Sequence, residues 1–354
     1  MDITSKAEAP VQAAVIGLGN IGLLYDIPLK AQPQSHSLAY HLHPKIDLVA
    51  AVGVRQEQGD TLALVAPRTE FYLDLVAMLR NHRLDIISIC TPSDVRFDLL
   101  KTVLENSSAR VIFLEKPVAT SIHEAEKIAA LAQSYNRTLL VNLSRRWSDG
   151  VVQIREAVRT EQYGKLKKIH LRYTRGIFNY GSHLFDLVRF VSGSIDQVRV
   201  IEQVPTNLDA REDWTYSFLF SLASGGIAGY AEAFDDRDFL IFEMDLYFEQ
   251  GKIEMLNSGD KIRYYATEAH PMLAGIKSLV LEHQEDNLLH QSSNIQNAVD
   301  HLVDVLTKGA KPISTLEDGI YPLYVAEALM KSHRNNGSVE KVRNNKNSGD
   351  GRAL

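Results

Sequence analysis

Lys116 stands where a lysine could act on a bound ligand. It follows the apolar run Val111–Leu114, which is typical of a strand buried on both faces of a parallel sheet. A glycine-rich turn, Gly17–Gly22, follows a similar run, Ala13–Ile16. Because parallel strands of a doubly wound sheet end at one edge, where ligands bind, we expect Lys116 to face whatever the glycine turn holds. Its ammonium could stabilise negative charge on a substrate oxygen; a structural salt bridge is the alternative.

The turn Gly-Leu-Gly-Asn-Ile-Gly has the spacing of a dinucleotide-binding loop. In this pattern Gly17 permits the tight bend, Gly19 lets the backbone approach a pyrophosphate, and Gly22 allows close packing of helix and strand. The N-terminus of the following helix would favour the phosphate. We therefore expect NAD(P)(H) to bind here, with Asn20 and Ile21 also in contact, rather than a purely structural turn.

The second expected strand, Leu48–Val52, ends without the carboxylate that takes the ribose hydroxyls of NAD. The chain continues instead as Gly53-Val54-Arg55. Without a carboxylate a 2′-phosphate is not repelled, and Arg55 could pair with it. The sequence thus slightly favours NADP(H) over NAD(H), although Arg55 could equally be a solvated surface residue.

Two patterns of elements divide the chain. Up to about residue 143 short apolar strands alternate with helical stretches, which predicts a parallel sheet with right-handed crossovers. After about residue 165, turns such as Ser224–Gly226 and Ser258–Asp260 predict antiparallel hairpins. The expected strands are Ala13–Ile16, Leu48–Val52, Ile86–Cys90, Val111–Leu114, Leu139–Asn142, Lys167–Tyr173, Tyr216–Leu222, Ile227–Ala233, Leu240–Phe248 and Lys261–Tyr265. The expected helices are Asp94–Glu105, Ser121–Tyr135, Ser293–Thr307 and Asp318–Ser332.

Four motifs in a fixed order make the chain similar to a known family. They are Gly17–Gly22, Asp85–Pro92, Glu115-Lys116-Pro117 and Gly181–Asp186. Together they resemble the Gfo/Idh/MocA family of oxidoreductases, sugar and inositol dehydrogenases among them. The resemblance implies an α/β protein: a doubly wound Rossmann domain over residues 1–143, then a substrate-binding and oligomerisation α/β domain over 144–340 with an open, mainly antiparallel sheet. Residues 341–354 form a tail that we expect to be disordered.

The resemblance also implies a catalytic set. His183 is the candidate acid/base, because histidine titrates near neutral pH, with packing as the alternative. Asp186 would share a helix face with His183 and orient its imidazole, unless it only caps or lies at the surface. Lys116 would act on the substrate oxygen, and a cis peptide before Pro117 is implied. The residues expected beside the cofactor include Thr91, Pro92 and Glu115.

The chain departs from the family pattern at two positions. Many members have Asp four residues before the histidine, where this chain has Asn179. An amide can hold a substrate hydroxyl but cannot share a proton, so more of the general-acid duty falls on His183. Members often have His at the position of Arg96. The sequence alone gives Arg96 no role.

Two further segments are candidates for substrate contacts. Arg146 and Trp147 follow the last strand of the first domain, and an arginine beside an indole suits an anionic or carbohydrate substrate. A salt bridge with packing is an equal alternative. An extra stretch between Gly22 and Ser35 could cover the cofactor or substrate, or be a surface elaboration.

Composition limits the remaining classes. The chain has 354 residues, 45% apolar and 23% charged, with a net charge of −6 and no charged block, which argues against a nucleic-acid partner. No apolar run approaches the ~20 residues that span a bilayer. The single cysteine, Cys90, excludes an intramolecular disulfide, and residues 1–10 lack the apolar core of a signal peptide. We expect a soluble cytoplasmic protein without a membrane partner.

The histidines do not predict a metal site. His36, His41 and His43 lie close together, but neither an acidic partner nor a helical His-x-x-x-His spacing completes a site. The sequence therefore predicts hydride transfer between NAD(P) and a hydroxyl or ketone carbon of a sugar, cyclitol or nucleotide sugar, by a homodimer or homotetramer. Two alternatives stay open: a lyase or glycosidase that oxidises its substrate transiently, and a non-enzymatic dinucleotide-binding regulator, against which Lys116 and His183 argue.

Overall fold

A computed structural model describes residues 9–208 and 213–343 of the chain. The predicted disorder of residues 341–354 is wrong at its start, because Lys341 belongs to a strand and Val342 is buried, while the tail from residue 344 onward lies outside the described residues. Contacts divide the chain into two units: Met1–Ser144 with Ser293–Gly319, and Arg145–Ser292 with Ile320–Leu354. Residues 293–319, which we had assigned to the second domain, therefore pack with the first unit. Within the described residues no helix is both long and apolar enough to cross a membrane.

The first unit contains a six-stranded sheet in which every pair is parallel. Its strand order, β3-β2-β1-β4-β5-β6, is that of a dinucleotide-binding doubly wound fold. The strands are β1 Val11–Ile16, β2 Ile46–Val52, β3 Glu70–Tyr72, β4 Ile86–Ile89, β5 Val111–Glu115 and β6 Thr138–Asn142. All residues of β4 and β5 are buried, as expected for strands covered on both faces. The predicted Rossmann domain is confirmed.

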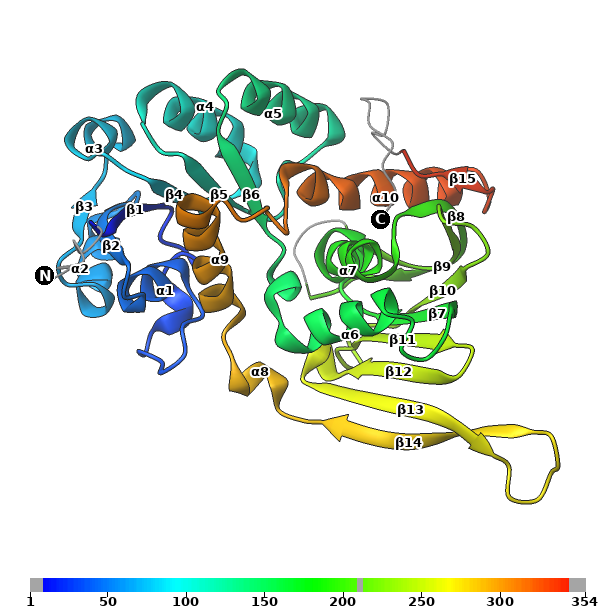
Figure 1. Ribbon diagram of the computed structural model, residues 1–354. Coiled ribbons are helices and arrows are strands. Elements are labelled where there is room, and N and C mark those ends of the chain that lie inside the picture. The colour runs from blue at the N-terminus through cyan, green and yellow to red at the C-terminus, as the bar shows by residue number, and fades with distance from the viewer. Residues whose placement is uncertain (1–8, 209–212, 344–354) are drawn as a thin grey trace, which may run out of the picture. The chain divides into compact units, whose positions relative to one another are not determined.

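Helices cover both faces of this sheet. Figure 1 shows α3, α4 and α5 along one face and α1, α2 and α9 along the other. Their bounds are α1 His36–Leu42, α2 Gln56–Val65, α3 Leu75–Asn81, α4 Arg96–Asn106, α5 Ile122–Ser134 and α9 Asn294–Lys308, with 3₁₀ turns at Leu24–Asp26 and Ser93–Val95. The Ser121 hydroxyl accepts from the Glu124 N–H and caps α5. A capping residue and apolar spacing explain why this segment is helical.

The helix expected directly after the glycine turn is interrupted. One helical turn forms first, since the N–H groups of Leu23 and Leu24 donate to the Gly19 carbonyl at 2.9 and 3.0 Å. The chain then leaves the helix and returns at α1, where the His36 N–H donates to the Ile21 carbonyl at 3.0 Å. The buried Asp26 carboxylate closes this excursion by accepting from Ser35. The extra stretch is therefore an insertion within the first helix.

The second unit contains a nine-stranded sheet in the order β14-β13-β12-β11-β7-β10-β9-β8-β15. Only β7 and β10 pair in parallel among its described strands, so the sheet is mainly antiparallel, as predicted. Strands β8, β12, β14 and β15 were not expected from the sequence. The strands are β7 Leu166–Tyr173, β8 Ile195–Pro205, β9 Trp214–Leu222, β10 Ala228–Ala233, β11 Phe242–Phe248, β12 Gly251–Leu256, β13 Lys261–Ala269, β14 Lys277–Glu285 and β15 Glu340–Lys341.

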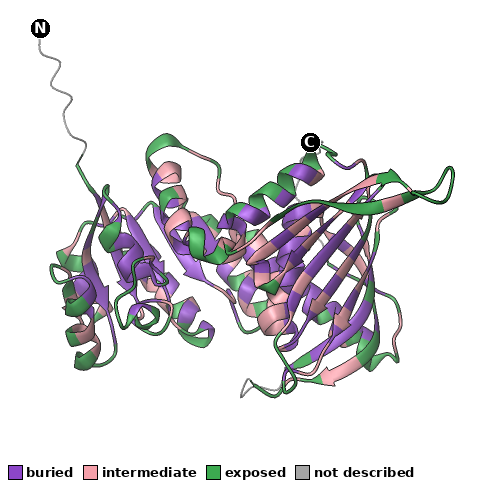
Figure 2. Ribbon diagram, turned by 90° about the horizontal axis from the view of Figure 1, so that it is seen from below, coloured by how far each residue is buried: buried purple, intermediate pink, exposed green. Residues whose placement is uncertain are grey.

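One face of this sheet carries the apolar core of the unit. Along β7, Ile169, Leu171 and Tyr173 are almost completely buried, whereas the residues between them are less buried, and Figure 2 shows this alternation along the strands. Phe185 of α7 packs edge-on against Phe218 of β9, which places α7 on that face. The helices are α6 Asp149–Arg159, α7 Ser182–Ser192, α8 Leu288–Gln291 and α10 Leu316–Arg334, which begins in the first unit; short turns lie at Ser144–Trp147, Gly176–Gly181 and Asn257–Gly259.

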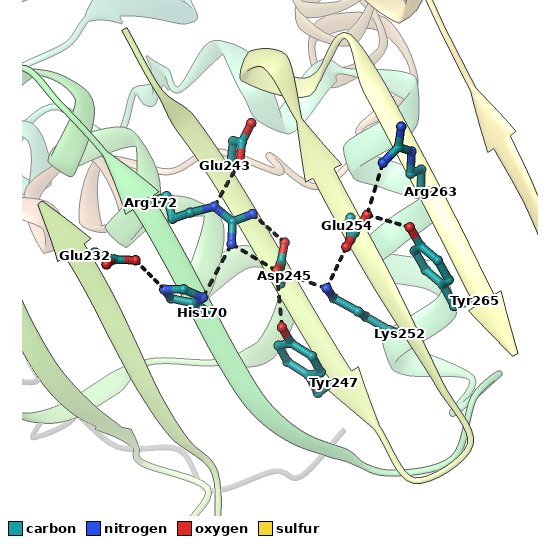
Figure 3. A network of polar contacts seen from close by, with 10 residues as sticks. All are labelled: His170, Arg172, Glu232, Glu243, Asp245, Tyr247, Lys252, Glu254, Arg263 and Tyr265. Carbon is teal, nitrogen blue, oxygen red and sulfur yellow. Dashed lines mark hydrogen bonds and ion pairs between the residues drawn. The ribbon is translucent and has the colours of Figure 1, made fainter. Parts of the chain in front are cut away.

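The opposite face carries a network of charged side chains (Figure 3). Asp245 lies at its centre and is 2% exposed. Arg172 Nη2 donates to one oxygen of its carboxylate at 2.8 Å, and Lys252 Nζ lies 3.2 Å from the other. Arg172 also binds Glu243, and Lys252 binds Glu254. Because opposite charges alternate, this central part of the face is polar but internally compensated.

Candidate functional site

The predicted cofactor residues of the first unit meet at one edge of its sheet. The glycine turn follows β1, Thr91 and Pro92 follow β4, and Lys116 follows β5. These three strands are neighbours and parallel, with Ile16 opposite Ile89 and Ile89 opposite Leu114. The structure therefore brings these loops together at the carboxyl ends of adjacent strands, where ligands bind in open α/β sheets.

The glycine turn fits a closely approaching dinucleotide. Gly17 has φ +96°, a conformation that favours glycine, and a Cβ added at Gly22 would lie 2.0 Å from the Gly17 carbonyl oxygen. A Cβ added at Gly19 would meet nothing within 4 Å. The space beside Gly19 suits a pyrophosphate, and the adjacent helical turn offers N–H groups to an anion. The buried Thr91 hydroxyl oxygen has no hydrogen-bond partner among residues 9–208 and 213–343, so it also suits a bound group.

Gln58, which sequence reasoning did not single out, joins the second strand to the glycine turn. Its Oε1 accepts from the N–H groups of Val54 and Arg55, and its Nε2 donates to the Leu18 carbonyl at 3.1 Å. Arg55 itself is the N-cap residue of α2, without a capping hydrogen bond from its side chain, which is exposed. This geometry fixes the backbone where a ribose would bind, and the choice between NAD and NADP stays a prediction.

The Glu115 carboxylate lies in a buried hydrogen-bonded cluster. Its Oε1 is 2.8 Å from His36 Nε2 and 2.5 Å from Asn142 Nδ2. His36 Nδ1 is 2.9 Å from the Ser88 hydroxyl, which is 2.6 Å from the Tyr40 hydroxyl. With the proton on Nε2, a consistent arrangement runs from Tyr40 through Ser88 and His36 to Glu115. The carboxylate before Lys116 is thus fixed from α1 and from β6.

Several interactions set the charge of Glu115. Burial alone would raise the pKa of this carboxyl, but the hydrogen bonds from His36 and Asn142 and the nearby Arg96 guanidinium outweigh burial and lower the pKa. Glu115 is therefore a carboxylate at neutral pH. Lys116 follows it, half-buried, and the Lys116–Pro117 peptide is cis, as the family resemblance implied.

Asn179 and His183 belong to a tightly turned segment of the second unit. Arg175 has φ +61° and Gly176 φ +72°, after which a π-helical turn, Gly176–Gly181, leads into α7. π-helical turns occur frequently at functional sites. The Ser182 hydroxyl donates to the Asn179 carbonyl at 2.7 Å. This geometry fixes the backbone that carries both residues, whose catalytic roles stay predictions.

Asp213 holds the start of this segment, and the sequence had not indicated it. Its carboxylate accepts from the N–H groups of Ile177 and Phe178 at 3.0 and 3.1 Å, and from its neighbour Trp214 at 2.8 Å. Burial raises the pKa of Asp213 to about 6, and these backbone donors oppose that rise only in part. No sequence signal points to this contact, because nearly every residue has a main-chain N–H that can donate to a carboxylate at any spacing.

Asp186 is bound by an arginine that we had considered for substrate. Arg146 Nη2 and Nε donate to Asp186 Oδ1 at 2.6 and 3.0 Å, and both residues are buried. The guanidinium also lies 4.9 Å from the Phe190 ring centre. The structure therefore shows the salt bridge with packing that was the alternative for Arg146, within the second unit. Contact of Arg146 and the buried Trp147 with substrate, and orientation of His183 by Asp186, remain predictions.

The three neighbouring histidines have separate environments. His36 is in the Glu115 cluster, His43 Nε2 lies 3.1 Å from Asp300, and His41 is exposed. Within the described residues no group of three or more His, Cys, Asp or Glu side chains could hold a metal ion. Burial raises the pKa of Cys90 well above its usual value, which suits a packing thiol.

Comparisons with known proteins agree with the fold. Residues 11–143 match the model of an oxidoreductase family with an NAD-binding Rossmann fold, GFO_IDH_MocA. The chain is similar to the D-glucoside 3-dehydrogenase of Escherichia coli (strain K12), with 22% identity over 54% of this chain and 56% of that protein. It spans about half the length of the curated relatives it matches.

Solved structures resemble the chain over almost all of its length. A putative NADPH-dependent oxidoreductase from Desulfitobacterium hafniense has a TM-score of 0.77 at 17% identity, covering 95% of this chain and 99% of that one. Levoglucosan dehydrogenase in complex with NADH and L-sorbose has a TM-score of 0.75 at 14% identity, covering 94% and 99%. At such identities the likeness establishes the fold and not the reaction.

Proposed function

Because the chain belongs to the Gfo/Idh/MocA family of oxidoreductases, we propose that it transfers a hydride between NAD(P) and the hydroxyl or ketone carbon of a sugar, cyclitol or nucleotide sugar. The observation that carries this proposal is the convergence of the glycine turn, Thr91 and Lys116 at the carboxyl ends of β1, β4 and β5. The names of two similar proteins, a D-glucoside dehydrogenase and levoglucosan dehydrogenase, support a carbohydrate-like substrate.

In this proposal the protein supplies binding and proton transfer, while the bound dinucleotide supplies or accepts the hydride. Gly17, Gly19 and Gly22 shape the loop on which the pyrophosphate rests. Lys116 donates a hydrogen bond to the reacting oxygen and stabilises its developing negative charge. His183 takes the hydroxyl proton in oxidation and returns it in reduction. Asn179 holds a substrate hydroxyl without exchanging a proton.

A cofactor-absorbance screen tests the reaction. The full chain is incubated with NAD⁺ or NADP⁺ and a panel of sugars, cyclitols and nucleotide sugars, and reduced nicotinamide is followed together with the sugar product. The expected result is stoichiometric formation of reduced cofactor and a keto product. Substrate conversion without net reduced cofactor would instead favour transient oxidation, and absence of any conversion in a chain that binds NADH would favour a regulator.

Substitutions test the catalytic assignment. Lys116→Ala and His183→Ala are each expected to lower kcat by about 10²-fold or more, the scale of lost electrostatic or acid/base help. NADH affinity and thermal unfolding serve as controls for folding. Wild-type turnover in both variants would remove the assignment.

Cofactor preference follows from the absence of an acidic residue after β2. We propose a slight preference for NADPH, in which the exposed Arg55 pairs with the 2′-phosphate. Affinities for NADPH and NADH are compared by ligand fluorescence in the wild type and in Arg55→Ala. The substitution should weaken NADPH binding only; NADH binding tenfold tighter than NADPH in the wild type would refute the preference.

We also propose that two or four copies associate through the open face of the large sheet. The support is the half-buried charge network around Asp245, whose compensated charges could be covered without leaving an isolated ion. Sedimentation measurements on the full chain test the assembly, and a monomer at all concentrations would contradict it.

A further inference from the structure

Arg96 is a buried arginine whose guanidinium binds main-chain carbonyl groups. The residue is 1% exposed. Its Nη1 donates to the carbonyl oxygens of Glu115, at 2.6 Å, and Pro117, and its Nη2 donates to the carbonyl oxygen of Thr91. Glu115 and Pro117 are the chain neighbours of Lys116. One side chain therefore holds the backbone on both sides of Lys116 and joins it to the loop after β4.

The contacts require the shape of an arginine. A guanidinium is a planar fork with five N–H donors, whereas an imidazole has two ring nitrogens and an ammonium directs its donors from one point. The three carbonyl groups come from two different loops, at the ends of β4 and β5. Arg96 is also the first residue of α4, so the helix fixes its own backbone. Neither histidine nor lysine could reproduce all three contacts in this geometry.

The charge of Arg96 is compensated nearby. Burial lowers the pKa of Arg96, and the Glu115 carboxylate is the main charge that opposes this by favouring the guanidinium. That carboxylate is itself held by His36 and Asn142. The residue before Lys116 is thus fixed through its side chain, from α1 and β6, and through its main chain, from α4. The backbone that carries Lys116 therefore has little freedom to reorient.

We propose that Arg96 is a positioning residue that sets the place of Lys116 relative to the Thr91 loop, and so aligns the lysine with a substrate on the bound dinucleotide. The inference rests on the proposed catalytic role of Lys116. Preorganised groups stabilise a transition state without reorganising during the reaction, and small misplacements of such groups are costly. In this proposal Arg96 contacts neither the substrate nor the dinucleotide and acts only through Lys116.

Hydrogen exchange on the full chain without substrate tests the structural part. Arg96→Met removes the fork and the charge at similar volume, and Arg96→Lys keeps the charge alone. Arg110→Met is the matched control, because Arg110 lies before the other end of β5 and its side chain is 60% exposed. In Arg96→Met, peptides covering residues 88–95 and 113–119 should exchange faster, while those from β2 and α2 keep the wild-type rate. Unchanged exchange in those two peptides would overturn the inference.

A double-mutant cycle tests the functional part, with the substrate and dinucleotide that the activity screen identifies. Arg96→Met should lower kcat by about 10²-fold, Arg96→Lys by about tenfold, and Arg110→Met not at all, with NADH affinity nearly constant. In a Lys116→Ala background, Arg96→Met should have almost no further effect on kcat, since its action passes through the lysine. Additive losses would overturn the positioning role.

The two arms separate failure of the inference from failure of the proposed function. If Lys116→Ala keeps wild-type turnover, the catalytic proposal fails, and with it the positioning role, whatever the exchange shows. If Lys116→Ala loses turnover but Arg96→Met exchanges normally or adds its full loss to that of Lys116→Ala, the catalytic proposal stands and the inference about Arg96 fails.

Discussion

Glu115 and Asp213 are two buried carboxylates that support different parts of the proposed chemistry in opposite ways. They are 7% and 8% exposed. Glu115 precedes Lys116 in the chain. Asp213 accepts hydrogen bonds from main-chain N–H groups of the segment that contains Asn179. Yet the pKa of Glu115 is lowered, whereas the pKa of Asp213 is raised to about 6. Equal burial therefore does not give equal acidity.

The difference lies in the partners. Burial raises the pKa of both groups, and hydrogen bonds to each lower it. Glu115 has, in addition to the hydrogen bonds from His36 and Asn142, the buried guanidinium of Arg96 nearby. The donors to Asp213 are main-chain N–H groups, which are dipoles and not full charges. Glu115, beside Lys116, is therefore a carboxylate at neutral pH, whereas Asp213 titrates near pH 6.

Removing each carboxylate should give the largest contrast. Glu115→Ala leaves the donors of His36 and Asn142 without their acceptor and takes away the anion that favours the Arg96 charge, so it should cost about 3–5 kcal/mol of unfolding free energy. Asp213→Ala only removes an acceptor from main-chain N–H groups, leaving no uncompensated buried charge, and should cost about 1–3 kcal/mol.

Urea unfolding measures this contrast. Circular dichroism follows Glu115→Ala, and tryptophan fluorescence follows Asp213→Ala, because both tryptophans, Trp147 and Trp214, lie in the second unit. Glu105→Ala, whose side chain is 43% exposed, is the control and should cost no more than about 0.5 kcal/mol. A larger loss for Asp213→Ala than for Glu115→Ala would reverse the comparison.

A smaller effect is expected for Glu115→Gln, and it depends on pH. The folded pKa of Glu115 lies below its ordinary value of 4.5, so the unfolded chain binds more protons in acid. The stability from this carboxylate is complete above pH 4.5 and is lost as the pH falls through the lower folded value. At neutral pH the amide should cost about 1–3 kcal/mol, since a neutral amide oxygen accepts more weakly than a carboxylate and no longer attracts the Arg96 guanidinium.

The test is the free-energy difference between wild type and Glu115→Gln across a pH series. The difference should be constant from neutral pH to about 5 and should shrink below 4.5. A difference that grows in acid would mean that the folded pKa is raised, and Glu115 would then resemble Asp213.

The parallel sheet and its motifs were predictable because apolar content and glycine spacing carry that signal. The expected strand Val111–Leu114 became β5 Val111–Glu115, and Lys116 lies at its end as predicted. By contrast, β14 was not expected, since Leu279, Val280 and Leu281 are all substantially exposed and give no alternation of apolar and polar residues. Strand β8 was missed for a related reason: two irregularities in its pairing break the period of two.

The supports of the site were not predictable. Arg96 binds carbonyl groups 5, 19 and 21 residues away, and carbonyl groups occur at every residue, so no residue type marks the partner. His36 reaches Glu115 across 79 residues, after an insertion that interrupts the first helix. Sequence reasoning located the residues that could do chemistry, and it could not locate the side chains that fix their backbone.

Asp213→Asn should have the smallest effect at neutral pH and the opposite dependence on pH. Between 3.8, the ordinary value, and about 6, the folded state binds more protons at Asp213 than the unfolded chain, so this group's contribution to stability falls as the pH rises through that window and is flat above it. The asparagine loses part of the acceptor capacity but also removes a buried charge, and we expect a net cost of about 1 kcal/mol or less at pH 7.

The advantage of wild type over Asp213→Asn, followed by tryptophan fluorescence in urea, should therefore be greatest near pH 4 and decline toward pH 6. For Glu115→Gln the corresponding advantage should be greatest at neutral pH. The wild-type advantage could instead change with pH in the same direction for both substitutions. In that case main-chain N–H groups compensate a buried carboxylate as well as a histidine, an amide and a guanidinium do, and the contrast between Glu115 and Asp213 disappears.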